Sequence, residues 1–111
     1  MTLSINLVNE SANDLYIAQL NSLPGTTITG LEQGQGITHG QQVKFTLSRN
    51  QEPTRTPDLG FFLTFDAPFG FNFIYESETD YQLIVQNKQI FEARLEHGAG
   101  NHFFIIVTRR T

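Results

Sequence analysis

The sequence has no cysteine, no tryptophan, no excess of basic residues and no long apolar run. Without cysteine, the chain forms no disulfide, no thiolate zinc site and no thiol nucleophile. Seven basic residues against eleven acidic ones give a formal net charge of -4, whereas nucleic-acid-binding domains normally carry a basic surface. No segment approaches the ~20 apolar residues of a membrane-spanning helix, and no signal peptide is recognisable. We therefore expect a protein that is soluble when made and does not bind nucleic acid.

Apolar and polar residues alternate through most of the chain, which is the pattern of half-buried β-strands. Turn-forming residues separate the alternating segments at intervals of roughly 8–12 residues, as in all-β sandwiches. No segment shows the period of an amphipathic helix. Strands are expected at residues 3–8, 15–20, 26–29, 43–48, 61–66, 71–76, 81–85, 91–96 and 102–108. The sequence thus predicts an all-β fold, a single-domain antiparallel β-sandwich of about eight or nine short strands spanning residues 1–111.

Three segments are expected to connect strands. Residues 30–40 contain four glycines and few apolar residues, so they are expected to form a loop. Residues 49–58 are polar and contain two prolines, which is typical of a surface loop, and they are expected to be the most mobile segment. Asn87 and Lys88 lie between two alternating segments, and Asn tolerates positive φ, so they are expected to form a two-residue hairpin turn.

The sequence gives little support to catalysis or metal binding. It has no Gly-x-Ser-x-Gly elbow, and its glycine-rich segment lacks the Lys-Ser/Thr ending of a phosphate-binding loop. His97 and His102 flank one turn and, with Glu96, would be able to approach a metal ion, but their spacing matches no zinc signature. The acidic run at residues 76–80 lacks the Gly and the distal Glu of a calcium loop. We expect a non-enzymatic protein with no cofactor and no metal site.

The most aromatic stretch of the chain, residues 60–76, holds six of its ten Phe. Its first half alternates and is expected to be a core strand. A break at residues 66–70 follows, in which Pro68 fixes φ and Gly70 is expected to permit a sharp bend. Phe69 and Phe71 lie beside this break. Their rings either cover the end of the core or stand exposed for a lipid, a sugar or a protein partner, and the usual burial of large aromatics favours covering.

Residues 65–72, Phe-Asp-Ala-Pro-Phe-Gly-Phe-Asn, resemble a motif of the aegerolysin family. In that motif an aromatic residue, Asp, a variable residue, Pro and a second aromatic precede a small-residue turn and an Asn. Residues 5–11 also resemble the family's first strand and its Asn-rich turn. Within the family, the likeness is greatest to the small components of binary insecticidal crystal toxins. The chain departs from the pattern by carrying Phe69 where Trp is more frequent, and by showing one expected strand rather than two between Phe45 and Asp66.

The resemblance implies a β-sandwich that binds lipid, often sphingolipid, at the surface of a target membrane. It also implies a larger pore-forming protein partner, so that this chain would be one component of a two-component cytolytic or insecticidal toxin. Such a toxin would act as hemolysins do, and the formation of oligomers is compatible with this function. Carried over residue by residue, it places lipid or partner binding at Asp66, Pro68, Phe69, Phe71 and Asn72. Two interpretations stay open beside it: a lectin-like carbohydrate-binding sandwich, and a non-enzymatic protein-interaction module.

Overall fold

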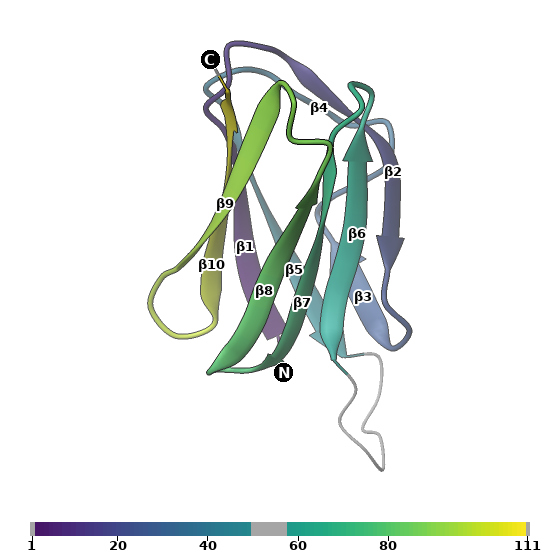
Figure 1. The fold of residues 1–111 in the computed structure, drawn as a ribbon. Helices are drawn as coiled ribbons and strands as arrows, with labels where there is room; N and C mark the ends of the chain where they lie inside the picture. The colour runs from purple at the N-terminus through teal and green to yellow at the C-terminus, as the bar shows by residue number, and fades with distance from the viewer. Residues whose placement is uncertain (1, 50–57, 111) are drawn as a thin grey trace.

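Ten strands are present in the structure, a computed structural model that describes residues 2–49 and 58–110 (Figure 1). In chain order they are β1 (Thr2–Asn9), β2 (Leu15–Ser22), β3 (Thr26–Thr29), β4 (Gly36–Ile37), β5 (Gln42–Arg49), β6 (Leu59–Phe65), β7 (Gly70–Ser77), β8 (Asp80–Gln86), β9 (Phe91–His97) and β10 (His102–Arg109). The predicted mobile loop at residues 49–58 lies almost wholly outside the described residues. No helix among residues 2–49 and 58–110 has the length and apolar character needed to cross a bilayer.

The strands pair into two five-stranded sheets packed face to face (Figure 1). Sheet 1 has the order β3-β5-β1-β10-β9, and sheet 2 has the order β4-β2-β6-β7-β8. The predicted all-β sandwich is confirmed. The pairing is antiparallel except between β1 and β10, which run parallel with Ser4 opposite His102. A parallel pair needs a long connection, and here most of the chain lies between the two strands.

The strand β4 lies inside the segment that was expected to be a loop, and it helps to raise the strand number above the predicted eight or nine. It pairs with the start of β2, with Leu15 opposite Ile37 and Tyr16 opposite Gly36. A Cβ atom on Gly36 would lie 2.8 Å from the ring of Tyr16, so glycine lets this ring lie across β4. A two-residue strand is too short to show alternation, which is why the sequence pattern missed it.

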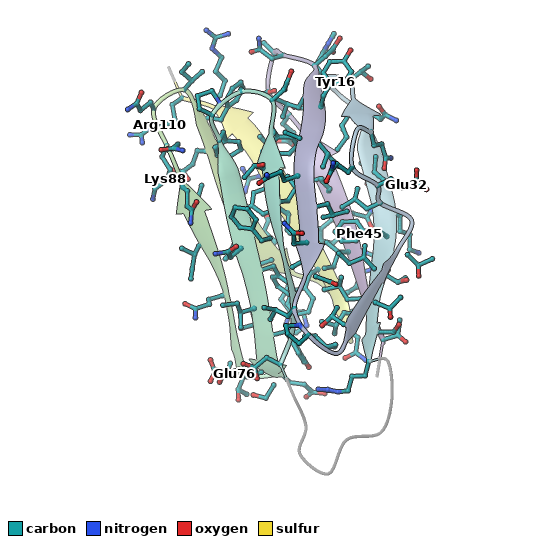
Figure 2. All side chains as sticks on the ribbon, turned by 90° about the vertical axis from the view of Figure 1, so that its right-hand side faces the viewer. Tyr16, Glu32, Phe45, Glu76, Lys88 and Arg110 are labelled. Atoms are coloured by element: carbon teal, nitrogen blue, oxygen red, sulfur yellow. The ribbon has the colours of Figure 1, made fainter. Side chains whose placement is uncertain are left out.

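Aromatic rings fill the space between the sheets, and the ring of Phe61 lies at the centre of this packing. Its centroid is 5.4 Å from that of Phe45 in sheet 1 and about as close to Phe71 and Phe73 in its own sheet, at 6.1 and 6.0 Å. Figure 2 labels Phe45 in the middle of the sandwich. Phe103 continues the contact toward β10, with 5.4 Å between its ring and that of Phe73. Burying each such ring stabilises the fold by roughly 1.5–3 kcal/mol.

A buried amide links the two sheets at the end of the sandwich where the C-terminus lies. Asn9, at the end of β1, is 1% exposed. Its Nδ2 donates to the backbone carbonyls of Asn13, at 2.8 Å, and Ile37, at 2.9 Å. Its Oδ1 accepts hydrogen bonds from the N–H of Ser11, at 3.0 Å, and from the Ser11 hydroxyl, at 2.6 Å. The amide therefore satisfies its polar atoms while holding β1 of sheet 1 to β4 of sheet 2.

A second buried polar group links the sheets near the opposite end. The hydroxyl oxygen of Thr26, in β3 of sheet 1, accepts a hydrogen bond of 3.3 Å from the N–H of Gly60 in β6 of sheet 2. The backbone carbonyl of Gly60 accepts from the N–H of Leu23, at 3.0 Å. Asn9, Ser11 and Thr26 are the buried polar residues of the described chain, and all of them take part in these two links.

We predict that Asn9→Ala lowers the free energy of unfolding by about 2–4 kcal/mol, because it leaves several buried polar groups without partners. Chemical denaturation measures this loss. Asn6→Ala is the matched control, since Asn6 lies on the same strand but bonds the exposed Gln42 side chain on the outer face. The control is expected to cost less than about 1 kcal/mol. Equal losses in the two variants would show that the buried amide has no special structural role.

Candidate functional site

The turn between β6 and β7 lies at the end of the sandwich where the C-terminus also lies (Figure 1). The N–H of Phe65 donates to the carbonyl of Phe69, at 2.9 Å, and the N–H of Phe69 donates to the carbonyl of Ala67, at 2.6 Å. The carboxylate of Asp66 accepts from the N–H groups of Ala67, at 3.0 Å, and Tyr16, at 3.3 Å. The Asp66 N–H donates back to the Tyr16 carbonyl, at 2.9 Å. The shape of the turn is therefore set by bonds within the protein.

The rings of Phe69 and Phe71 are buried, with 2% and 0% of their surface exposed. Phe69 stacks on Phe65, with 5.8 Å between ring centroids and 8° between planes. On its other side it lies 5.5 Å from the ring of Phe91 in β9. This confirms the possibility that residue burial favoured and corrects the alternative that these rings stand exposed to contact a lipid or partner. They cover the end of the core, because β9 supplies an apolar surface on which Phe69 packs.

Gly70 has a different role from the one expected. It is the first residue of β7 and is absent from the described residues with positive φ, so it makes no sharp bend. A Cβ atom there would lie 2.5 Å from the backbone oxygen of Leu63 in β6. Glycine is needed because the two strands approach closely. Pro68 is exposed at the tip of the turn, where its fixed φ suits the bend.

Asn72 lies on the outer face of sheet 2, opposite Phe62, rather than at the turn. A hollow of about 200 Å³ opens on this face, and its lining includes Asn21, Phe62, Asn72 and Ile74. The structure therefore separates the five predicted residues into three places. Asp66 and Pro68 lie at the turn, the two Phe rings lie in the core, and Asn72 lies on a sheet face.

Exposed apolar and cationic side chains surround the β6–β7 turn. We call this set, Tyr16, Pro68, Lys88, Ile90 and Arg110, the end patch. Tyr16 and Ile90 are 51% and 48% exposed. A small hollow of about 30 Å³ lies between the β6–β7 turn and the β8–β9 connection, and Pro68 and Ile90 line it. Figure 2 shows Tyr16, Lys88 and Arg110 toward the same end of the sandwich.

The C-terminus fixes the cationic side of the end patch. The Arg110 guanidinium donates to the carbonyl of Lys88, at 2.6 Å, and the Arg110 N–H donates to the carbonyl of Ile90, at 2.7 Å. Asn87 has a φ of 58°, as expected, but the predicted two-residue hairpin at Asn87 and Lys88 is wrong. The strands β8 and β9 belong to different sheets and do not pair, and residues 87–90 connect one sheet to the other. Sequence reasoning missed this patch because it joins residues from β2, the β6–β7 turn, the β8–β9 connection and the C-terminus. The only local signal was large apolar residues at exposed positions, as at Tyr16.

The two histidines near one turn lie on opposite faces of sheet 1. His97 stacks on the buried ring of Phe103, with 4.4 Å between centroids, and its Nε2 lies 2.7 Å from the Gly100 carbonyl oxygen. His102 instead packs beside Phe104, with 4.7 Å between centroids. The sheet thus separates the imidazoles. Within the described ranges, no group of three or more His, Asp or Glu is placed to hold a metal ion.

Two exposed carboxylates at opposite ends of the sandwich have shifted pKa values. Hydrogen bonds from the backbone N–H and ring of His39 lower the pKa of Asp14. The pKa of Glu76 is raised, first by a hydrogen bond with the Asp80 side chain and then by repulsion from Asp80 and Asp58. Figure 2 labels Glu76 at the end remote from Tyr16. The end of the sandwich away from the end patch therefore carries crowded negative charge.

Comparison with known proteins supports the fold only. No protein-family model matches the sequence, and no curated protein matches it. Among solved structures, the chain is similar to IP-1A from Alcaligenes faecalis, with a TM-score of 0.69 and 11% sequence identity over 100% of this chain and 92% of that one. It is also similar to RahU protein, solved in complex with a TRIS molecule, with a TM-score of 0.69 and 7% identity over 99% and 96% of the two chains. These likenesses show a shared fold over essentially the whole chain.

Phe69→Ala is predicted to lower the free energy of unfolding by about 3–5 kcal/mol, because it opens a cavity between Phe65, Phe71 and Phe91. Pro68→Ala is the matched control at the neighbouring exposed position, and we expect it to cost less than about 1 kcal/mol. Thermal and urea unfolding measure both. If Phe69→Ala proves as stable as the unchanged protein, the ring is not a core residue.

The raised pKa of Glu76 predicts a specific pH dependence. A carboxyl group whose pKa is higher in the folded state stabilises the fold at low pH and loses that contribution as pH rises through its folded pKa. We therefore expect Glu76→Gln to raise the melting temperature more at pH 7 than at pH 4. Glu78→Gln, in the same turn, is the control and should show a smaller difference between the two pH values. A gain for Glu76→Gln that is independent of pH would contradict this prediction.

Proposed function

We propose that this protein binds membrane lipid, sphingolipid in particular, and acts as the smaller component of a two-component pore-forming toxin. The observation that carries the proposal is the similarity of fold to IP-1A and RahU over essentially the whole chain. The resemblance of residues 65–72 to the aegerolysin motif supports the same conclusion. We assign no catalytic activity to the chain, and we assign pore formation to a larger protein partner.

The end patch has the chemistry that a lipid-binding surface requires. Tyr16 has an apolar ring with a polar tip, which suits the boundary between headgroups and acyl chains. Ile90 and Pro68 add apolar surface next to it. Lys88 and Arg110 place positive charge beside this surface, where a phosphate in a lipid headgroup would meet it. We therefore propose that the end patch is the surface that meets the membrane.

The motif residues hold the end patch in position, and their rings do not contact the lipid. The buried Phe69 holds the turn against Phe65 and Phe91, and Asp66 ties the turn to the backbone of Tyr16. Both contacts fix the position of Pro68 and Tyr16 before any ligand binds. A surface that is shaped in advance loses less conformational freedom on binding, which increases affinity.

We expect the double substitution Tyr16→Ser and Ile90→Ser to weaken binding to sphingomyelin-containing liposomes by at least about tenfold, because two half-exposed apolar side chains no longer enter the membrane. Liposome sedimentation measures the bound fraction. Ile84→Ser is the matched control: Ile84 is 42% exposed but lies on the outer face of sheet 2, away from the end patch. Its binding to liposomes should be unchanged.

Three results would refute the proposal at different points. If the unchanged protein stays in the supernatant with every lipid mixture, it does not bind membranes. If it binds and also releases an encapsulated dye by itself, it needs no larger partner. If Ile84→Ser weakens sedimentation as much as the double substitution does, the end patch is not the surface that binds.

A further inference from the structure

The outer face of sheet 2 carries an unbroken row of four side chains across four strands. Asn21 in β2 is opposite Phe62 in β6, Phe62 is opposite Asn72 in β7, and Asn72 is opposite Ile84 in β8. Phe62 and Asn72 are partly buried, while Asn21 and Ile84 are exposed. The row therefore presents one aromatic ring between two carboxamides, with an aliphatic side chain at its edge.

Neighbouring positions on this face extend the same chemistry. One flanking row aligns Gln19, Thr64, Gly70 and Gln86, and the other aligns Gly60, Ile74 and Gln82. The two glycines lie where a Cβ atom would meet a backbone oxygen of a neighbouring strand, at 2.2 Å for Gly60 and 2.5 Å for Gly70. Together the three rows contain five carboxamides and no ionisable side chain.

The outer face of sheet 1 is different, and it serves as an internal comparison. One of its rows aligns Lys44, Asn6, Phe104 and Glu96, and the next places Arg94 beside Ile106. An aromatic ring on that face is thus flanked by charges of both signs. The absence of charge around Phe62 is therefore not a general property of the exposed sheet faces of this protein.

The central row borders a hollow whose size suits a single sugar residue. The hollow measures about 200 Å³, below the ~300–1,000 Å³ typical of pockets for drug-sized ligands, and Asn21, Phe62, Asn72 and Ile74 are in its lining. Within the described part of the chain, the carboxamides of Asn21 and Asn72 form no side-chain hydrogen bond. By contrast, the Asn6 amide on sheet 1 donates to Gln42, at 2.7 Å. Both amides at the hollow are available to a ligand.

We propose that the outer face of sheet 2 binds a neutral carbohydrate, with the sugar ring packed on Phe62 and its hydroxyls bonded to Asn21 and Asn72. A carboxamide offers two N–H donors and an acceptor oxygen, so it can bond two adjacent hydroxyls at once. The C–H face of a sugar is apolar and weakly positive, which complements the negative face of an aromatic ring. A neutral ligand also avoids the cost of desolvating a charge with no partner on this face.

This site is separate from the lipid-binding end patch and does not depend on it. The end patch is formed by two turns, the start of β2 and the C-terminus, whereas the central row crosses the middle of four strands. Substitutions in one surface therefore leave the other intact. Failure of lipid binding and failure of sugar binding can be told apart with the same set of variants.

The test begins with an array of neutral glycans built from glucose, galactose, mannose and N-acetylglucosamine, with sialylated and sulfated glycans as charged counterparts. We expect retention on neutral members and weaker retention on charged ones. An NMR titration with the best neutral oligosaccharide should then shift the side-chain NH₂ signals of Asn21 and Asn72, while that of Asn6 stays in place. Absence of binding to every neutral glycan, or preferential binding to charged ones, overturns the proposal.

Two variants measure the contributions of the ring and the amide. Phe62→Ala and Asn72→Ala should each weaken sugar binding by about tenfold or more, which corresponds to one or two lost contacts. Phe104→Ala and Asn6→Ala are the matched controls on sheet 1 and should bind as the unchanged protein does. Asn72→Asp keeps the shape of the side chain but adds charge and should also weaken binding. Unchanged binding in all three sheet 2 variants overturns the proposal.

Such a face could also bind a second copy of this chain in place of a carbohydrate. Sedimentation equilibrium separates the two cases. A monomer supports a carbohydrate site, whereas a dimer that Phe62→Ala dissociates and that neutral sugar does not affect shows that the face is an interface between copies, which overturns the proposal.

Discussion

Packing between the two sheets is the constraint on which the rest of the structure depends, since the chain has no disulfide to join them. Aromatic rings around Phe61 fill the interior, and two buried polar side chains, Asn9 and Thr26, add hydrogen bonds between the sheets near opposite ends. Apolar packing is nondirectional and would tolerate sliding, whereas hydrogen bonds require particular partners. The polar links therefore fix how one sheet sits on the other, and with it the position of the turns at each end.

The same constraint decides which residues of the aromatic segment reach the surface. In β7, the alternation of a strand directs Phe71 inward and Asn72 outward, so one short motif supplies both a core ring and a surface amide. Phe69 lies in the turn, but its ring packs in the core because Phe65 and Phe91 are its apolar neighbours. This motif of eight residues therefore acts mainly by positioning a turn. It exposes Asp66 and Pro68, and the other side chains of the end patch come from other parts of the chain.

The sequence predicted the features that local periodicity determines. Alternation placed nine of the strands and the core positions of Phe61 and Phe65, and the positive φ of Asn87 followed from the tolerance of Asn for that conformation. The features that depend on distant partners were not predictable. The pairing of β4 with β2, the parallel pairing of β1 with β10 and the burial of Phe69 against Phe91 each join residues far apart in the chain. Local pattern carries no information about such contacts.

The geometry of a sandwich also explains how one small domain can present two unlike surfaces. Strands run from end to end, so the turns at an end and the outward side chains of a sheet point in roughly perpendicular directions. In the arrangement that we propose, the apolar and cationic end enters headgroups while the uncharged amide face points along the membrane plane. Tyr16 belongs to β2, whose later residue Asn21 lies in the central row of sheet 2. Because both residues lie on β2, our two proposals place the surfaces at different positions along one strand, so that both can be occupied together.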